Sequence, residues 1–425
     1  MDIRKFLIAV VGLLTSFNVF ATGNCRPGVY SDGAANAAVL RNEPEDGSGI
    51  RYLMLDGVFG NTQSETAPFK CQSKFIRLNN SAATPLELVS LRRTFTTFTS
   101  AHTQLSGELI EPLSATQNTY PLVVMVHGSE QEPAIGNSRA LLLAAMGIAV
   151  FTYDKRGTGQ SAGFYTQNFE LLAEDAAAAM KHARSIVTGN IKHAGFWGAS
   201  QGGWVAPLAA TLTPVDFVVV SYGLIASPIE EDLDQMLLEA QQQQHSASVL
   251  KQIRRLSKIT TKILLSNFNA GLVELEQLRM ELKSQPWANR INGEYSGAML
   301  RMSDKDLRRI GRAYFDNLEL IWDYESLPVL KKLQVPILWI VAEKDREAPV
   351  ERTLQSLRML KKFNSKLHVY IFPNTDHGMY EYSEMADGSR NNIRVTNGYF
   401  RLIVDWLNEK EQPYSGNGFL LNSVN

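Results

Sequence analysis

The 425-residue sequence has almost no net charge, only two cysteines and no very long hydrophobic run. Its 42 Lys and Arg residues balance 43 Asp and Glu residues, so the formal net charge is −1. Because nucleic-acid binding depends on Lys and Arg that neutralise phosphates, this balance argues against a nucleic-acid partner. The sequence also lacks repeats of solenoid period and long low-complexity segments. Repeat architectures and a largely disordered chain are therefore excluded.

Motifs for metals and nucleotide cofactors are missing as well. The sequence has no HExxH, no paired CxxC and no P-loop. In the glycine-rich segment 157–163, Ala162 stands where a dinucleotide-binding GxGxxG motif needs its third glycine. We therefore expect no metal and no cofactor.

Residues 1–21 are typical of a secretory signal peptide. Arg4 and Lys5 precede an apolar stretch at 6–17, and Val19 and Ala21 lie three residues before and directly before a possible cleavage point. The alternative is a membrane anchor, but the stretch is shorter than the roughly 20 residues that span a bilayer. We expect a soluble mature protein, exported to the periplasm or secreted, with no stable membrane anchor after cleavage.

Export to an oxidising compartment makes the two cysteines interpretable. Cys25 and Cys71 both fall early in the mature chain, and such a compartment permits them to pair. We predict a disulfide between them, with two separate buried thiols as the alternative.

The pattern of apolar runs and turn residues along the chain predicts an N-terminal accessory region and an α/β core. Residues 22–90 hold short apolar runs separated by Gly, Asn, Asp and Pro, which favours strands and turns. From Leu91 the chain alternates continuous apolar runs with helical stretches, which predicts a mostly parallel sheet covered by helices. The expected buried strands are 122–126, 148–153, 194–197, 217–220 and 337–341, and the expected helices are 138–146, 169–186 and 204–212.

A helical insertion divides this core into 91–227 and 326–412, before a C-terminal tail at 413–425. Residues 228–325 are rich in Leu, Glu, Gln, Lys and Arg with helical apolar spacing, as at Leu250, Ile253 and Leu256. We interpret them as a helical cap over the active site, which would exclude water and select substrates. An oligomerisation face is the alternative.

A candidate nucleophile, Ser200, lies in a G-x-S-x-G pattern at 198–202, directly after a predicted strand and before a predicted helix. Small neighbours allow a sharp turn that exposes the serine hydroxyl, and the following helix points N–H groups at a developing oxyanion. The alternative is a tight turn in which Ser200 is an exposed serine without a catalytic role.

Of the seven histidines, His377 is the candidate base, because it lies in the loop 373–378 that follows the last expected strand, the run 367–372. An imidazole needs a carboxylate to orient it. Asp345 is favoured because it lies well into the loop after strand 337–341, with Glu347 next and Glu343 as a surface charge. Asp376 adjoins His377, and neighbouring side chains in an extended loop normally diverge.

These residues, in the order Ser200, Asp345 and His377, resemble the α/β-hydrolase superfamily, in its serine esterase and prolyl-peptidase-like branch. An exported bacterial-type member fits the predicted signal peptide. His127-Gly128-Ser129 resembles a family oxyanion loop, and 154–161 resembles the family's glycine-rich loop. The resemblance implies that Ser200 attacks an acyl carbonyl and that the backbone N–H groups of Gln201 and Ser129 hold the oxyanion.

The substrate class stays open between two enzymes and a binding module. A small acyl substrate is expected, with a carboxylic ester first, because esters demand least protonation of the leaving group. A peptidase or aminopeptidase is second, since Glu130 and Glu132 could hold a substrate amino group, although solvated loop charge is favoured for both. The third alternative is a non-catalytic binding module. Asp154 and Arg156 are interpreted as part of a structural ion pair that braces the glycine-rich loop.

The signal-peptide interpretation predicts that the mature protein, expressed in its native host, begins at Thr22. N-terminal sequencing tests this expectation. A mature protein that begins at Met1 would remove the case for export.

Overall fold

The computed structural model describes residues 25–42, 49–72, 74–79, 84–113, 119–316, 318–410, 414 and 416–421. The predicted signal peptide lies outside them. Within these ranges, no helix combines the length and the apolar character that crossing a bilayer requires.

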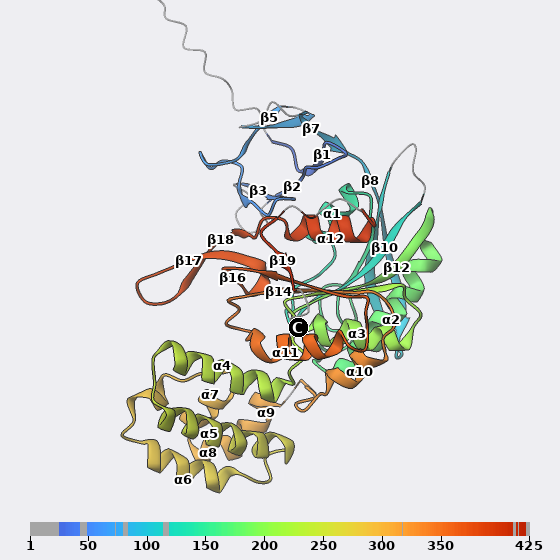
Figure 1. Ribbon diagram of the computed structural model, residues 1–425. Coiled ribbons are helices and arrows are strands. Elements are labelled where there is room, and N and C mark those ends of the chain that lie inside the picture. The colour runs from blue at the N-terminus through green and yellow to red at the C-terminus, as the bar shows by residue number, and fades with distance from the viewer. Residues whose placement is uncertain are drawn as a thin grey trace, which may run out of the picture.

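The core is a nine-stranded sheet built on the predicted apolar runs (Figure 1). Its order is β19-β15-β14-β13-β12-β10-β11-β9-β8, with parallel pairing from β15 to β11 and antiparallel edges. The strands are β8 (Leu91–Ser100), β9 (Thr103–Pro112), β10 (Thr119–Val126), β11 (Ala149–Tyr153), β12 (Asn190–Ala199), β13 (Phe217–Ser221), β14 (Ile337–Ala342), β15 (Leu367–Phe372) and β19 (Phe419–Leu420). Because parallel strands run the same way, the residues after β12, β13 and β14 share one edge.

Helices cover both faces of this sheet, which explains why its central strands are apolar throughout. One face packs against α1 (Ser138–Ala145) and α12 (Tyr399–Leu407). The other packs against α2 (Phe169–Ile186), α3 (Gly202–Leu212), α10 (Ser326–Lys332) and α11 (Val350–Leu360). The fold is therefore the predicted α/β class.

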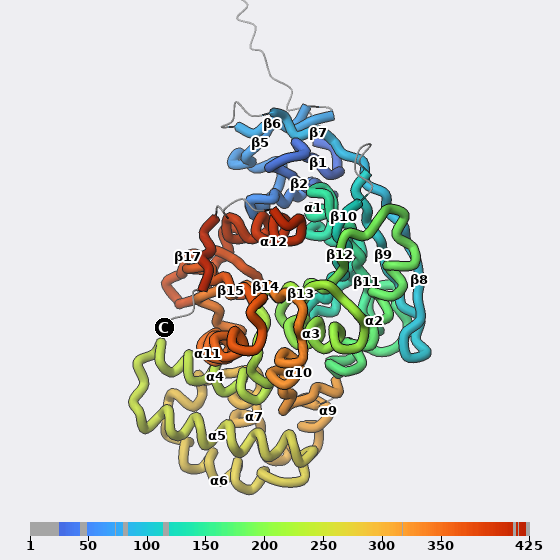
Figure 2. The backbone as a smooth tube through the Cα atoms, turned by 45° about the vertical axis from the view of Figure 1, so that its right-hand side comes forward, coloured from blue at the N-terminus to red at the C-terminus, as the bar shows by residue number. Residues whose placement is uncertain are grey.

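The N-terminal region forms its own antiparallel sheet with the order β4-β3-β2-β1-β7-β6-β5. The strands are β1 (Gly28–Ser31), β2 (Ala37–Asn42), β3 (Ile50–Met54), β4 (Phe59–Asn61), β5 (Phe69–Gln72), β6 (Phe75–Leu78) and β7 (Leu86–Val89). The predicted disulfide between Cys25 and Cys71 is present, with Cα atoms 5.1 Å apart. The sheet packs on the side of α1 and α12, at the opposite end of the molecule from the cap (Figures 1 and 2).

The helical cap begins with a well-defined helix start. Ser227 accepts from the Glu230 backbone N–H, the Glu230 carboxylate accepts from the Ser227 N–H, and Pro228 occupies the first turn of α4. The cap has a separate apolar core, so it packs as a unit of its own. Its helices are α4 (Pro228–Gln242), α5 (Ala247–Leu265), α6 (Leu272–Leu282), α7 (Ser296–Arg301), α8 (Asp304–Asp306) and α9 (Arg312–Phe315), with short 3₁₀ and π turns at Pro286–Asn289 and Leu307–Gly311.

Two small features near the C-terminus differ from the expected layout. After β15 the chain forms a three-stranded sheet of β16 (Thr375–Asp376), β17 (Tyr380–Glu384) and β18 (Arg390–Val395), and β16 lies within the segment 373–378 that was predicted as a loop. In the segment predicted as a tail, β19 pairs with β15 and extends the core sheet.

The disulfide closes a long loop, since its cysteines are 46 residues apart in sequence. Replacing both Cys25 and Cys71 by serine is expected to destabilise the N-terminal sheet by about 4 kcal/mol, because the unfolded chain regains conformational freedom. Hydrogen exchange should show faster exchange in β1–β7 and unchanged protection in β12–β14. Equal protection of β1–β7 in both proteins would contradict the expectation.

Candidate active site

Ser200 lies on a sharp turn between β12 and α3, with a φ of 52° that non-glycine residues rarely adopt. The turn is tight enough to require glycine at two positions. A Cβ at Gly198 would lie 2.0 Å from the Gly202 carbonyl oxygen, and one at Gly202 would lie 2.2 Å from that of Val126. The Ser200 N–H donates to the Ser221 carbonyl at 3.1 Å, which ties the turn to β13. The structure therefore holds this serine at the carboxyl edge of the sheet in a strained conformation.

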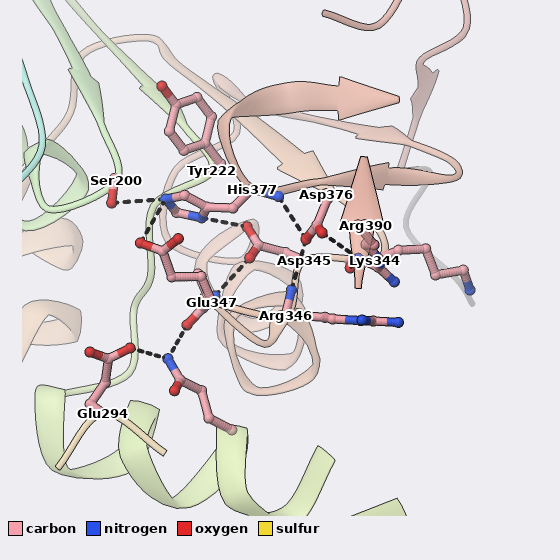
Figure 3. A network of polar contacts seen from close by, with 12 residues as sticks. Ser200, Tyr222, Glu294, Lys344, Asp345, Arg346, Glu347, Asp376, His377 and Arg390 are labelled. Carbon is pink, nitrogen blue, oxygen red and sulfur yellow. Dashed lines mark hydrogen bonds and ion pairs between the residues drawn. The ribbon is translucent and has the colours of Figure 1, made fainter. Parts of the chain in front are cut away.

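His377 contacts both other residues of the predicted set (Figure 3). Its Nε2 lies 3.1 Å from the Ser200 Oγ, and its Nδ1 lies 2.9 Å from the Asp345 Oδ2. Asp345 is 3% exposed, and its other oxygen accepts from the Ala348 N–H at 2.7 Å. The three side chains thus form one hydrogen-bonded row, although they come from loops 177 and 32 residues apart in sequence.

Asp345 and Glu347 face different nitrogens of the imidazole. Glu347 lies 3.5 Å from Nε2, the nitrogen that faces Ser200, and its side chain is 59% exposed. An orienting acid must bind the other nitrogen, and only Asp345 does so within the described residues.

The Asp345 carboxylate also sets the basicity of the imidazole. Burial lowers the pKa of His377, but the hydrogen bond and charge of Asp345, together with the charges of Glu347 and Asp376, leave this pKa above its usual value. The ring packs edge-on against Tyr222, with centroids 5.0 Å apart, and Arg139 donates to the Tyr222 hydroxyl at 2.8 Å. The histidine is thereby held by packing as well as by hydrogen bonds.

Asp376 diverges from the His377 ring, as expected, yet it fixes the histidine backbone (Figure 3). Its Oδ1 accepts from the N–H groups of His377 at 2.9 Å and Arg346 at 3.1 Å. Its Oδ2 lies 2.6 Å from Arg390, whose side chain is 8% exposed. This ion pair joins the histidine loop to β18, a contact that the sequence analysis missed because it depends on how the hairpin folds.

A pocket of about 430 Å³ opens at Ser200, between the core and the cap. Its apolar wall is formed by Trp204, Leu224, Tyr314, Phe315, Leu320 and Trp322. Its acidic wall is formed by Glu231, Glu294 and Glu347, of which the first two come from the cap and were not predicted. Burial, followed by the neighbouring carboxylates, raises the pKa of Glu231 well above its usual value. None of the described residues of the N-terminal sheet lines this pocket.

The two predicted oxyanion residues, Ser129 and Gln201, line the same pocket. Within the part of the chain that the structure describes, neither backbone N–H donates a hydrogen bond to another protein group. Both amides are therefore available to an atom bound beside Ser200.

The remaining polar residues singled out from the sequence are either exposed or hydrogen-bonded within the fold. Glu130 and Glu132 are exposed, as the solvated-charge interpretation requires. Arg156 does form a buried ion pair, but its partner is Asp175 on α2. Asp154 instead accepts three backbone N–H groups, from residues 134, 135 and 160. Among the described residues, no group of three or more His, Cys, Asp or Glu side chains is placed to hold a metal.

Comparison with known proteins found one family match and several distant structural likenesses. Residues 117–267 match the family described as "Serine aminopeptidase, S33". No curated protein matches the sequence significantly. Similar solved structures include the esterase Pf2001 of Pyrococcus furiosus, at 15% identity and a TM-score of 0.42 over 68% of this chain and 83% of that one. The proline iminopeptidase of Mycobacterium smegmatis is 16% identical, with a TM-score of 0.43 over 74% and 98%. These likenesses are too low to transfer a substrate.

The order of the core sheet and the family match over residues 117–267 identify the fold of the core as that of the α/β-hydrolases.

Replacing Asp345 by Asn is expected to lower the pKa of His377, because the charge that opposes burial is removed while burial remains. NMR titration of ¹³C-labelled histidine rings measures this pKa, and the His377→Gln variant identifies the resonance. An unchanged titration in Asp345→Asn would show that the contact does not govern the imidazole.

Proposed function

We propose that the protein is a serine hydrolase that cleaves a carboxylic ester through an acyl-enzyme on Ser200. The observation that carries this proposal is the hydrogen-bonded row of Ser200, His377 and Asp345 beside a pocket. His377 Nε2 accepts the Ser200 proton as Oγ attacks the ester carbonyl carbon. Asp345 holds the Nδ1–H and stabilises the imidazolium.

The remaining steps use groups at the same edge of the sheet. The carbonyl oxygen becomes an oxyanion, which the N–H groups of Ser129 and Gln201 stabilise. Collapse of this intermediate expels the alkoxide, which takes the proton from His377. Water then attacks the acyl-enzyme, with His377 as base, and the acid leaves as Ser200 recovers its proton.

The residues that form the two walls of the pocket indicate which kind of substrate it would accept. The aromatic and aliphatic wall suits an apolar acyl chain. The raised pKa of Glu231 favours its protonated form, which fits a neutral ester. The proposed substrate is therefore a neutral ester of modest size, and export would place the reaction in the periplasm or outside the cell.

A second candidate, hydrolysis of an aminoacyl amide or peptide, is favoured by the same acidic wall. Among the described residues, no Lys or Arg lines the pocket beside Glu231, Glu294 and Glu347. A substrate ammonium group would compensate these carboxylates and return the pKa of Glu231 toward its ordinary value.

Replacing Ser200 by Ala is expected to reduce turnover by at least about 10,000-fold, because the covalent intermediate cannot form. Steady-state kinetics on short-chain acyl esters, with circular dichroism as the folding control, measures the effect. Residual turnover near the wild-type rate would exclude the assigned nucleophile.

Replacing Glu231 by Gln separates the two substrate classes, because glutamine resembles the protonated acid. For an ester hydrolase, kcat/KM on neutral esters should stay within about threefold of wild type, since no charged contact is lost. For an aminopeptidase, kcat/KM on aminoacyl amides should fall about 10-fold to 100-fold, because a charged hydrogen bond is lost. Efficient hydrolysis of aminoacyl amides alone, with that loss, would replace the ester proposal.

A further inference from the structure

Lys155 is a buried cation that the proposed acyl-transfer steps leave unused. It follows β11, is 3% exposed, and donates from Nζ to the Gly128 carbonyl oxygen at 2.6 Å. Its ammonium also lies 5.0 Å from the centre of the Tyr165 ring. It makes no ion pair within 4.0 Å among the described residues. Burying a cation without a paired anion is costly, and here the Gly128 carbonyl is the acceptor that compensates part of that cost.

The Gly128 carbonyl and the Ser129 N–H belong to the same peptide group. This peptide is trans, so its C=O and its N–H point in opposite directions. Holding the oxygen at Lys155 therefore directs the N–H away from Lys155. The peptide borders the nucleophile, since a Cβ at Gly128 would lie 3.2 Å from the Ser200 Cβ.

The residues on either side of this peptide are held from the same part of the chain. The Tyr165 hydroxyl donates to the Ser129 carbonyl oxygen. His127 donates from Nε2 to the Tyr153 carbonyl at 3.1 Å, and burial, followed by the charge of Lys155, lowers the pKa of this histidine to about 4. Three consecutive residues, 127 to 129, are thus held by β11 and by residues 155 and 165 in the segment that follows it.

We infer that Lys155 is a positioning residue for the oxyanion site: its ammonium orients the Gly128–Ser129 peptide and polarises it so that the Ser129 N–H becomes a stronger donor. The inference rests on the proposed function. A positive charge at the carbonyl oxygen draws electron density from the amide nitrogen, and hydrogen bonds in such a chain strengthen one another. The benefit arises when negative charge develops on the substrate, so Lys155 acts on the transition state.

The charge of Lys155 is sensitive to pH. Burial lowers its pKa to about 8, and the carboxylates of Glu130 and Glu132 oppose that shift. Neutral His127 and the Tyr165 ring face the same ammonium. The charge is present below about pH 8 and is lost as the pH rises through that value. Wild-type kcat should therefore decline on the alkaline side near pH 8, beyond the rise caused by deprotonation of His377.

Three variants test the inference through kcat, KM and the pH profile of ester hydrolysis. Lys155→Met should lower kcat about 100-fold with KM within about threefold, because the affected contact exists only with the oxyanion. Lys155→Arg keeps a charge at every accessible pH, so it should retain activity and lose the decline near pH 8. Lys192→Met, which removes an exposed lysine at the far end of β12, is the matched control and should behave as wild type.

Wild-type kcat in a folded Lys155→Met, or an unchanged alkaline decline in Lys155→Arg, overturns the role of Lys155 while leaving the proposed function in place. If Lys155→Met does not fold, the wild-type decline and its removal in Lys155→Arg remain as readouts. A wild-type protein that hydrolyses neither short-chain acyl esters nor aminoacyl amides overturns the proposed function and this inference together.

Discussion

The hydrogen bond between Asp345 and the His377 Nδ1 is the contact on which the site depends. It selects the tautomer that leaves Nε2 facing Ser200, and it counteracts the burial that would make the imidazole a poor base. The contact joins two separate loops, because Asp345 follows β14 and His377 follows β15 and the short β16. The parallel pairing of β14 and β15 brings the loops together at one edge.

The position of His377 is supported by elements well outside the pocket. Asp376 binds the histidine backbone and pairs with Arg390 on β18. The end of that strand donates from the Val395 N–H to the Gly57 carbonyl at 3.0 Å, and Phe59 packs edge-on against Tyr380. The N-terminal sheet therefore braces the hairpin that holds the histidine loop, although it lies far from the pocket. This contact gives the accessory region a structural role that needs no contact with substrate.

The backbone of the site could be predicted from sequence because buried parallel strands leave a simple signal. The continuous apolar runs gave the central strands, and the glycines around Ser200 gave the turn, since a side chain at either position would meet backbone. The disulfide followed from the cysteine count and the predicted export. Asp345 was preferred over Glu347 by its place in the loop, and the structure gives the physical reason in the nitrogen that each carboxylate faces.

The contacts that could not be predicted join elements that are far apart in the sequence. A local sequence pattern does not show how such elements pack against each other. Glu231 and Glu294 reach the pocket from separate parts of the cap, and Arg390 reaches Asp376 from a hairpin that was not predicted. The ion pair of Arg156 was expected, but its partner on α2 depends on how that helix packs. Lys155 stood inside a recognised motif, and only the direction of its side chain shows which peptide it holds.

The central claim is that Ser200 is a nucleophile activated by His377, and covalent labelling tests it without knowledge of the substrate. Intact-mass spectrometry after treatment with a fluorophosphonate should show one adduct on the wild-type chain, mapped to the peptide that contains Ser200. The adduct should be absent in Ser200→Ala and should form much more slowly in His377→Gln. A folded wild-type protein that stays unlabelled, or that carries its adduct on another residue, would contradict the account.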